Sequence, residues 1–426
     1  MRMSNKDTSA MSEENNEKTA LVPRLRFPEF RETGEWRIEA LGKLAKRCTK
    51  KNSEGEHKRV LTNSAEYGVI DQRDYFDKDI ANQGNLEGYY IVEKGDYVYN
   101  PRISASAPVG PISKNNLGTG VMSPLYTVFR FNGSANEFFA HYFKSPHWHQ
   151  YMREASSTGA RHDRMSITND DFMNMPLPVS TPKEQQKIAD CLSSIDERMA
   201  AENRKLGTLK VYKNGLLQQL FPCEGETVPR LRFPEFRDAE AWKEVELSTR
   251  IDLISGLHLA PDEYADAGDV PYFTGPSDYA NDLALVGKWT SHSANSGRAG
   301  DILITVKGSG VGELLYLELD EVAMGRQLMA VRPRGVHGEF IFHFLATQRQ
   351  RLIALASGNL IPGLSRGDIL SLTVSVPERE EQQAIADCLS SLDDVIAVQS
   401  QKIDVLQAHK KGLMQQLFPA LSEVQE

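Results

Sequence analysis

The sequence has 426 residues, 40% hydrophobic and 25% charged, which is ordinary for a globular protein with room for two to four domains. It holds no apolar run near the roughly 18 residues of a membrane span, and its polar start lacks the apolar core of a signal peptide, so we expect a cytoplasmic protein without membrane contact. The net charge of −9 neither supports nor excludes a nucleic-acid partner, because region 23–183 is net positive and region 229–380 is net negative.

Two strings occur twice along the chain. The string VPRLRFPEFR spans Val22–Arg31 and Val228–Arg237, and a near-identical eleven-residue string spans Glu184–Ser194 and Glu381–Ser391. In a structural repeat array the whole repeat is similar from copy to copy. Here only the strings are similar, and the stretches between them look almost unrelated. The protein is therefore two copies of one unit. We call the repeated strings the frame, and the two variable regions between them, 36–184 and 242–381, the heads.

Each head is predicted to contain strands followed by an aromatic helix. Strands are expected within Gly95–Arg102 and Ser123–Arg130 of the first head, and within Gly300–Lys307 and Gly325–Arg332 of the second. Helices are expected from Glu137 and from Glu339. This mixture of strands and helices at short spacing predicts two small α/β domains.

The second pair of strings begins two long helices. Thr181-Pro-Lys-Glu184 fits a capping box with Pro at the first helical position, and both helices end at a Leu-Phe-Pro. Apolar residues then follow a 4-3 spacing, which predicts an antiparallel coiled coil between the two helices, related by a pseudo-twofold axis. The alternative is that each helix packs on its own globular domain. The predicted interface residues are Ile188, Leu192, Ile195, Met199, Leu206, Leu209, Leu216, Leu220, Ile385, Leu389, Leu392, Ile396, Ile403, Leu406, Leu413 and Leu417.

Motifs for catalysis or metal binding are scarce. The four cysteines form no C-x-x-C pair, and the chain lacks a phosphate loop, an H-E-x-x-H and the Asn-Pro-Pro-aromatic tetrapeptide of amino-methylating enzymes. The glycine-rich run Gly308–Gly312 follows a strand, but the βαβ pattern of a nucleotide site is missing. We therefore expect no catalytic residue, no cofactor site and no metal site in this chain.

The repeated opening, the paired helix starts and ends, and the unrelated heads resemble the DNA specificity subunit of a type I restriction–modification system over Val22–Pro419. The resemblance implies a non-enzymatic chain in which each head is a target recognition domain reading one half of a bipartite site on double-stranded DNA. It implies two methyltransferase (M) subunits and restriction (R) subunits as partners, with S-adenosylmethionine, ATP and Mg in those partners. A coiled-coil protein scaffold without DNA specificity is the main alternative, and an active methyltransferase is the third.

The expected domains are a disordered tail over 1–21, recognition domain 1 over 22–180, spacer helix 1 over 181–222, recognition domain 2 over 223–376, spacer helix 2 over 377–419 and a tail over 420–426. The candidates for DNA contact are basic side chains at strand ends, in flexible turns and in a basic run, together with one asparagine. For each of them an ordinary surface or ion-pairing role is the alternative. These candidates are Lys46, Arg47, Arg102, Arg161, His162, Arg164, Lys307, Arg326 and Asn359.

Overall fold

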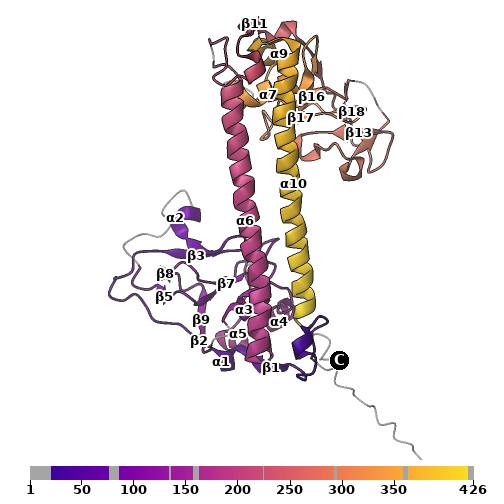
Figure 1. Cartoon of the computed structure of the whole chain (residues 1–426). Coiled ribbons are helices and arrows are strands. Elements are labelled where there is room, and N and C mark those ends of the chain that lie inside the picture. The colour runs from indigo at the N-terminus through magenta and orange to yellow at the C-terminus, as the bar shows by residue number, and fades with distance from the viewer. Residues whose placement is uncertain are drawn as a thin grey trace, which may run out of the picture. The chain divides into compact units, whose positions relative to one another are not determined.

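The computed structural model of the chain describes residues 21–75, 86–133, 136–156, 163–223, 225–291, 295–357 and 363–420. The chain divides into two compact units (Figure 1). Unit 1 comprises Met1–Ala201 with Ile403–Glu426, and unit 2 comprises Glu202–Lys402. The division falls inside the two long helices, so each unit holds one head and parts of both helices. The domain borders expected from the sequence stay predictions.

Unit 1 combines short strands with short helices. Its strands are β1 (Arg37–Ala40), β2 (Ala45–Arg47), β3 (Leu61–Ser64), β4 (Gly68–Asp71), β5 (Tyr90–Val92), β6 (Tyr97–Tyr99), β7 (Ile112–Lys114), β8 (Gly120–Met122), β9 (Thr127–Phe131) and β10 (Pro176–Val179). Its short helices are η1 (Pro28–Phe30), α1 (Leu41–Leu44), α2 (Gln72–Tyr75), α3 (Asn136–Tyr142), α4 (His149–Ala155) and α5 (Asn169–Met173).

Unit 2 has a corresponding set of elements. Its strands are β11 (Lys243–Glu246), β12 (Ile251–Ser255), β13 (Val270–Phe273), β14 (Trp289–Thr290), β15 (Ser296–Arg298), β16 (Ile302–Thr305), β17 (Leu314–Tyr316), β18 (Glu321–Met324), β19 (Leu328–Pro333) and β20 (Thr373–Val376). Its short helices are η2 (Pro234–Phe236), η3 (Leu247–Thr249), η4 (Pro276–Asp278), η5 (Leu283–Leu285), α7 (Gly338–Thr347), α8 (Arg349–Ser357) and α9 (Arg366–Leu370).

The two heads share a central sheet despite their unrelated sequences. The strand order is β2-β9-β6-β7 in unit 1 and β12-β19-β16-β17 in unit 2, with antiparallel pairing throughout both sheets. Elsewhere in unit 2, β13 pairs with β18 in parallel. The four predicted strand segments hold β6, β9, β16 and β19, and the expected mixture of strands and helices is confirmed.

The predicted aromatic helices are each two helices, so their expected continuity is wrong. In unit 1 the break between α3 and α4 contains Pro146, which has no N–H to continue the helical hydrogen bonds. In unit 2, α7 ends at Thr347. The next residue, Gln348, donates its N–H to the carbonyls of Phe344 and Leu345, and α8 starts at Arg349.

The predicted long helices are present as α6 (Pro182–Leu220) and α10 (Arg379–Leu417), each of 39 residues. The Thr181 hydroxyl accepts from the Glu184 N–H at 3.3 Å, which is the first half of the predicted capping box. The Glu184 carboxylate binds Arg26 instead of turning back to the helix start.

Arg26 and its repeat equivalent Arg232 explain why the opening string is repeated. Arg26 makes a bidentate pair with Glu184 at 2.7 and 2.9 Å, and Arg232 makes the equivalent pair with Glu381 at 2.7 and 2.7 Å. The residue before each arginine donates its backbone N–H to a helix-end carbonyl, from Leu25 to Gln416 and from Leu231 to Gln219, at 2.9 Å in both units. Each opening string is therefore fixed between the start of one long helix and the end of the other.

Within each unit the two long helices contact each other through residues that interrupt the apolar stripe. Lys410 of α10 pairs with Asp196 of α6 in unit 1. In unit 2, Lys213 pairs with Asp393, and Gln399 donates to the Glu202 carboxylate at 2.8 Å.

None of the sixteen predicted interface residues is exposed, and seven are buried. Ile188 and Leu192 also belong to the core of unit 1, whereas Leu220, Ile385 and Leu389 belong to the core of unit 2. The alternative, that each helix packs on its own globular domain, therefore holds at the start of each helix, whereas the end of each helix packs in the core of the other unit. The seven buried residues are Ile188, Leu192, Leu220, Ile385, Leu389, Ile403 and Leu417.

The core of unit 1 includes Leu21. Leu21, which was predicted to end the N-terminal tail, is 4% exposed, and its carbonyl accepts from the Trp36 N–H at 2.8 Å. Residues 1–20 and 421–426 lie outside the described residues.

One buried histidine in each unit joins the aromatic helix to a long helix. His141 Nε2 lies 2.9 Å from Ser193 Oγ, and His343 Nε2 lies 3.2 Å from Ser390 Oγ. Burial lowers the pKa of His141 to about 4 and that of His343 to about 3, with nearby lysines adding to the shift. Both imidazoles are therefore neutral at pH 7.

Candidate nucleic-acid interface

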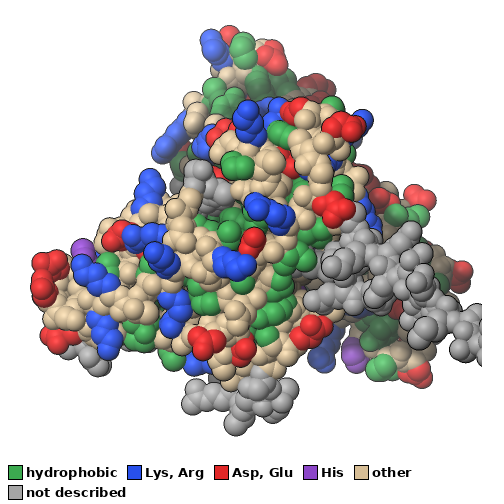
Figure 2. All heavy atoms as spheres, turned by 90° about the horizontal axis from the view of Figure 1, so that it is seen from below, with side chains coloured by type: hydrophobic (Ala, Val, Ile, Leu, Met, Phe, Trp, Pro, Cys, Tyr) green, Lys and Arg blue, Asp and Glu red, His purple; other side chains and the backbone are tan. Residues whose placement is uncertain are grey.

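The negative net charge does not make every surface of the molecule acidic. Figure 2 shows one face on which Lys and Arg side chains are spread among polar and apolar side chains. Among the described residues, no three His, Cys, Asp or Glu side chains are grouped so that they could hold a metal ion. No described helix combines the length and the apolar character that crossing a membrane requires.

An ion pair between a buried aspartate and a partly exposed arginine joins the two central strands of each head. Asp96, directly before β6, is fully buried and accepts two bonds from Arg130 of β9, at 2.5 and 3.0 Å. Asp301 and Arg332 form the same pair in unit 2, at 2.9 and 2.7 Å. The Gly-Asp motif and this arginine therefore tie the two central strands of each head together. In unit 1 the other ends of these strands carry the loops that follow β6 and precede β9.

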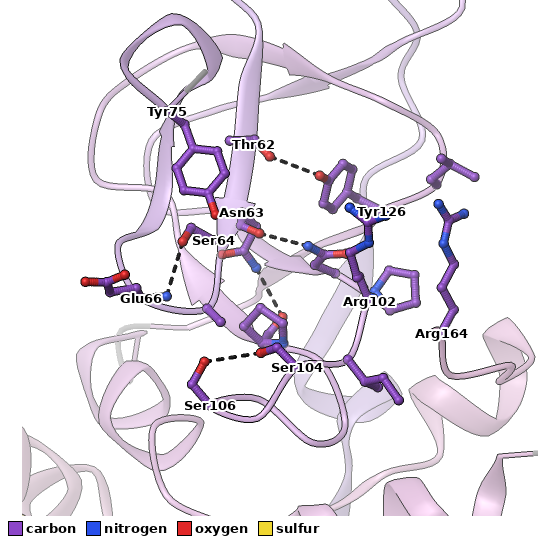
Figure 3. Close-up of a pocket in the computed structure, with 16 residues that line it drawn as sticks. Thr62, Asn63, Ser64, Glu66, Tyr75, Arg102, Ser104, Ser106, Tyr126 and Arg164 are labelled. Carbon is purple, nitrogen blue, oxygen red and sulfur yellow. Dashed lines mark hydrogen bonds between the residues drawn. The ribbon is translucent and has the colours of Figure 1, made fainter. Parts of the chain in front are cut away.

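A cavity of about 320 Å³ opens where these loops meet in unit 1 (Figure 3). Polar side chains form much of its wall. Asn63 donates to the carbonyls of Val98 and Pro111 at 2.7 and 3.1 Å, and Thr62 shares a hydrogen bond with the Tyr126 hydroxyl at 3.0 Å. The wall is therefore held by bonds to the main chain and between side chains.

Two of the predicted DNA-contacting arginines line this cavity. Figure 3 shows Arg102 and Arg164 on the same side as Tyr126, with Tyr75 and Glu66 on the other side. Their backbones form an antiparallel bridge, and each guanidinium lies 3.8 Å from the carboxylate of Asp163. Such long, exposed pairs contribute little stability, so both arginines can exchange this carboxylate for another anion. The arrangement suits a phosphate or a base edge.

A tight turn between β8 and β9 brings an apolar side chain to the same cavity. The Tyr126 N–H donates to the Ser123 carbonyl at 3.0 Å, and this turn leaves Leu125 at its tip with 62% of its surface exposed. An exposed leucine beside two arginines was not among the sequence candidates. Comparing the tips of the two predicted strand pairs would have found it.

Unit 2 has the same turn with different side chains. The Leu328 N–H donates to the Gly325 carbonyl at 2.9 Å, so Arg326 and Gln327 occupy the places of Pro124 and Leu125. Both side chains are exposed, and Gln327 lies against Gly308, the residue after Lys307. The Val306 N–H donates to the Gln327 carbonyl at 2.7 Å, so the backbone just before Lys307 is bonded to the turn that carries Arg326.

The loop that returns to the long helix also differs between the units. The Met165 N–H donates to the Pro101 carbonyl in unit 1, and the Leu364 N–H donates to the Val306 carbonyl in unit 2. This match places Gly363 where unit 1 has Arg164. Three matched positions thus differ between the heads: the strand end, the turn tip and the return loop.

The remaining candidates do not join these sites. Lys46 is exposed on β2 and Arg47 is partly buried next to it, and neither lines the cavity. Arg47 keeps a buried Nε with no hydrogen-bond partner among the described residues. Arg161, His162 and Asn359 lie outside the described residues.

The sequence is similar to curated specificity subunits. It is 25% identical over 264 residues to the putative type I restriction enzyme MjaX specificity subunit of Methanocaldococcus jannaschii, which covers 60% of this chain and 61% of the relative. It is 24% identical over 296 residues to the MjaVIII specificity subunit of the same organism, covering 62% of this chain and 65% of the relative. The chain spans less than two thirds of the length of these relatives.

Solved structures show the same fold. The S subunit of a type I restriction–modification system from M. genitalium superposes with a TM-score of 0.59 at 16% identity, covering 93% of this chain and 99% of that chain. A chain from a structure of type I R-M system assembly gives 0.56 at 19% identity, covering 90% and 97%.

The family described as the type I restriction modification DNA specificity domain matches residues 36–211 and again residues 239–408. Each match covers most of one head and the long helix that follows it. The chain therefore belongs to the type I restriction modification DNA specificity domain family.

Proposed function

We propose that this chain is the sequence-specific DNA-binding subunit of a type I restriction–modification complex. Each unit reads one half of a bipartite target on double-stranded DNA. The chain itself carries out no chemistry. It directs adenine-N6 methylation and restriction by two methyltransferase subunits and by restriction subunits, which hold S-adenosylmethionine, ATP and Mg.

One observation carries this proposal. The two heads keep the same central sheet, the same buried Asp–Arg pair and the same turn, yet they differ at the three positions that those features present. Arg102, Leu125 and Arg164 in unit 1 correspond to Lys307, Gln327 and Gly363 in unit 2. A scaffold that binds only proteins gives no reason for such a difference, whereas two half-sites of different sequence require it.

The contacts of the long helices support an antiparallel coiled coil with a pseudo-twofold axis. Asp196 and Asp393 are repeat equivalents, as are Lys213 and Lys410, and each aspartate pairs with the lysine of the other repeat. Glu202 and Gln399 are also equivalents, and they bond to each other. Contacts between equivalent residues are what a twofold arrangement produces.

This arrangement sets expectations for the target. Each long helix has 39 residues and is about 59 Å long, and we propose that these helices set the spacing of the half-sites, whose centres then lie about 10 base pairs apart. The twofold relation further predicts that the halves are read in opposite orientations, with the methylated adenines on opposite strands.

The experiment is methylation mapping of genomic DNA from cells that express this chain with its methyltransferase partner. We expect one bipartite motif with an unspecified gap. A matched chain in which Trp36–Thr181 is replaced by the same region of another specificity subunit should change one half of the motif only. Methylation without a motif, or a change in both halves, would contradict the proposal.

A further inference from the structure

The turn between β8 and β9 in unit 1 and the matching turn between β18 and β19 in unit 2 have chemically different tips. In unit 1 the tip is Pro124–Leu125, and in unit 2 it is Arg326–Gln327. All four residues are exposed, and the turns share the same backbone hydrogen bond. Position and exposure are thus constant, whereas the tip changes from apolar to hydrogen-bonding.

Leu125 is held in a fixed place on the surface. The Tyr126 N–H donates to the Ser123 carbonyl at 3.0 Å, and the Leu125 N–H lies 3.4 Å from Ser123 Oγ. The neighbouring Tyr126 hydroxyl is tied to Thr62 at 3.0 Å. A leucine on an anchored turn loses little conformational freedom on binding, so its position can discriminate between neighbouring groups.

The surroundings of Leu125 indicate what it meets. It lines the cavity together with Arg102 and Arg164, whose guanidinium groups favour an anionic ligand. Among the groups that duplex DNA presents in its major groove, the thymine 5-methyl group is the apolar one. Arginine and glutamine, at the same tip in unit 2, bind guanine and adenine edges through hydrogen bonds.

Resting on the proposed function, we infer that Leu125 is a specificity-determining residue that packs on the 5-methyl group of one thymine in the half-site read by unit 1. The matched tip of unit 2 reads its half-site through hydrogen bonds from Arg326 and Gln327. The two heads therefore use one backbone position for two kinds of base recognition.

Deoxyuridine tests this inference, because it differs from thymidine only by the missing methyl group. In duplexes with the mapped target, each thymidine of the unit 1 half-site is replaced in turn, and the affinity of the complex with its methyltransferase partner is measured. We expect about a fourfold loss at one position, which corresponds to about 0.8 kcal/mol for one buried methyl group. Leu125→Ala should bind thymidine and deoxyuridine equally at that position.

Matched controls separate this effect from general damage. Leu285, 74% exposed in unit 2, gives the variant Leu285→Ala, which should keep the sensitivity to deoxyuridine. Gln327→Ala should alter base preference only in the other half-site. Because Leu125 is exposed, Leu125→Ala should melt at the wild-type temperature.

The outcomes are distinguishable. A unit 1 half-site without thymine, a complex with no sensitive position, or a Leu125→Ala variant that keeps the sensitivity would overturn the assignment and leave the proposed function standing. Loss of methyltransferase assembly in Leu125→Ala would make the tip a protein contact and also overturn it. Absence of any sequence-specific methylation would instead remove the proposed function.

Discussion

Removing Arg130 should weaken the central sheet of unit 1 more than altering its partner Asp96. In Arg130→Met, a carboxylate that is fully buried keeps the Glu93 N–H, at 2.7 Å, but loses both guanidinium bonds. Breaking a buried ion pair in this way costs 3–5 kcal/mol. Because the Arg130 side chain is 46% exposed and water can partly replace it, we expect about 3 kcal/mol.

Asp96→Asn should cost less, because it leaves no buried charge. The amide oxygen can still accept from the Glu93 N–H, and the half-exposed Arg130 keeps its pair with the Glu93 carboxylate at 2.8 Å. The loss is then the charge-assisted part of two hydrogen bonds, about 1–2 kcal/mol. We therefore expect Arg130→Met to lower the free energy of local opening more than Asp96→Asn does.

Hydrogen exchange of peptides that cover β6 and β9 measures the free energy of local opening. Exchange should quicken about 100-fold in Arg130→Met and roughly 5- to 30-fold in Asp96→Asn, since each 1.4 kcal/mol is tenfold. Peptides that cover β16 and β19 carry the unaltered Asp301–Arg332 pair and serve as the control within the same chain. Equal effects of the two variants, or a change below threefold in Arg130→Met, would refute the reasoning.

Three further predictions concern DNA contact, acidity and spacing. Arg102→Ala should weaken specific DNA binding by about 1–3 kcal/mol if it contacts a base, and unchanged affinity with intact folding would remove that role. Because the pKa of His343 is lowered to about 3, the folded state binds fewer protons than the unfolded state below about pH 6.5. The free energy of unfolding should therefore fall by up to about 1.4 kcal/mol per pH unit from pH 6.5 downward. Thermal melts of His343→Gln should show a weaker dependence of stability on pH. An identical dependence in the variant would exclude His343 as its source. Four residues inserted after Met199 lengthen the helix by about 6 Å, so methylation mapping should find a gap longer by one or two base pairs, and an unaltered gap with retained activity would show that the coil does not set the spacing.

The long helices and central strands could be predicted because local, repeated sequence patterns indicate them. Proline stops, 4-3 spacing and the Gly-Asp strands each act within a few residues of the chain, and these patterns located α6, α10 and the central strands. The role of Arg26 could not be read in the same way, since its partner Glu184 is 158 residues away. Long-range pairs carry no local signal.

The candidate site was predictable only in part. Arg102 at a predicted strand end and Arg164 in a predicted loop are visible in the sequence, and both line one cavity. Lys46 and Arg47 form an equally basic run, yet β2 places them away from it. Leu125 was missed because an exposed leucine has no motif, and its position becomes informative only when the two turns are superposed.

The bond between Glu202 and Gln399 bears on which molecules can pair. If two first repeats from separate chains formed the same antiparallel contact, Glu202 would face a second Glu202, and two carboxylates would share one site at a cost in stability. The intact chain has one carboxylate there, which accepts a hydrogen bond from the Gln399 amide and pairs with Lys402. The difference of one side chain between the repeats thus favours pairing of a first repeat with a second repeat over pairing of two first repeats from separate chains.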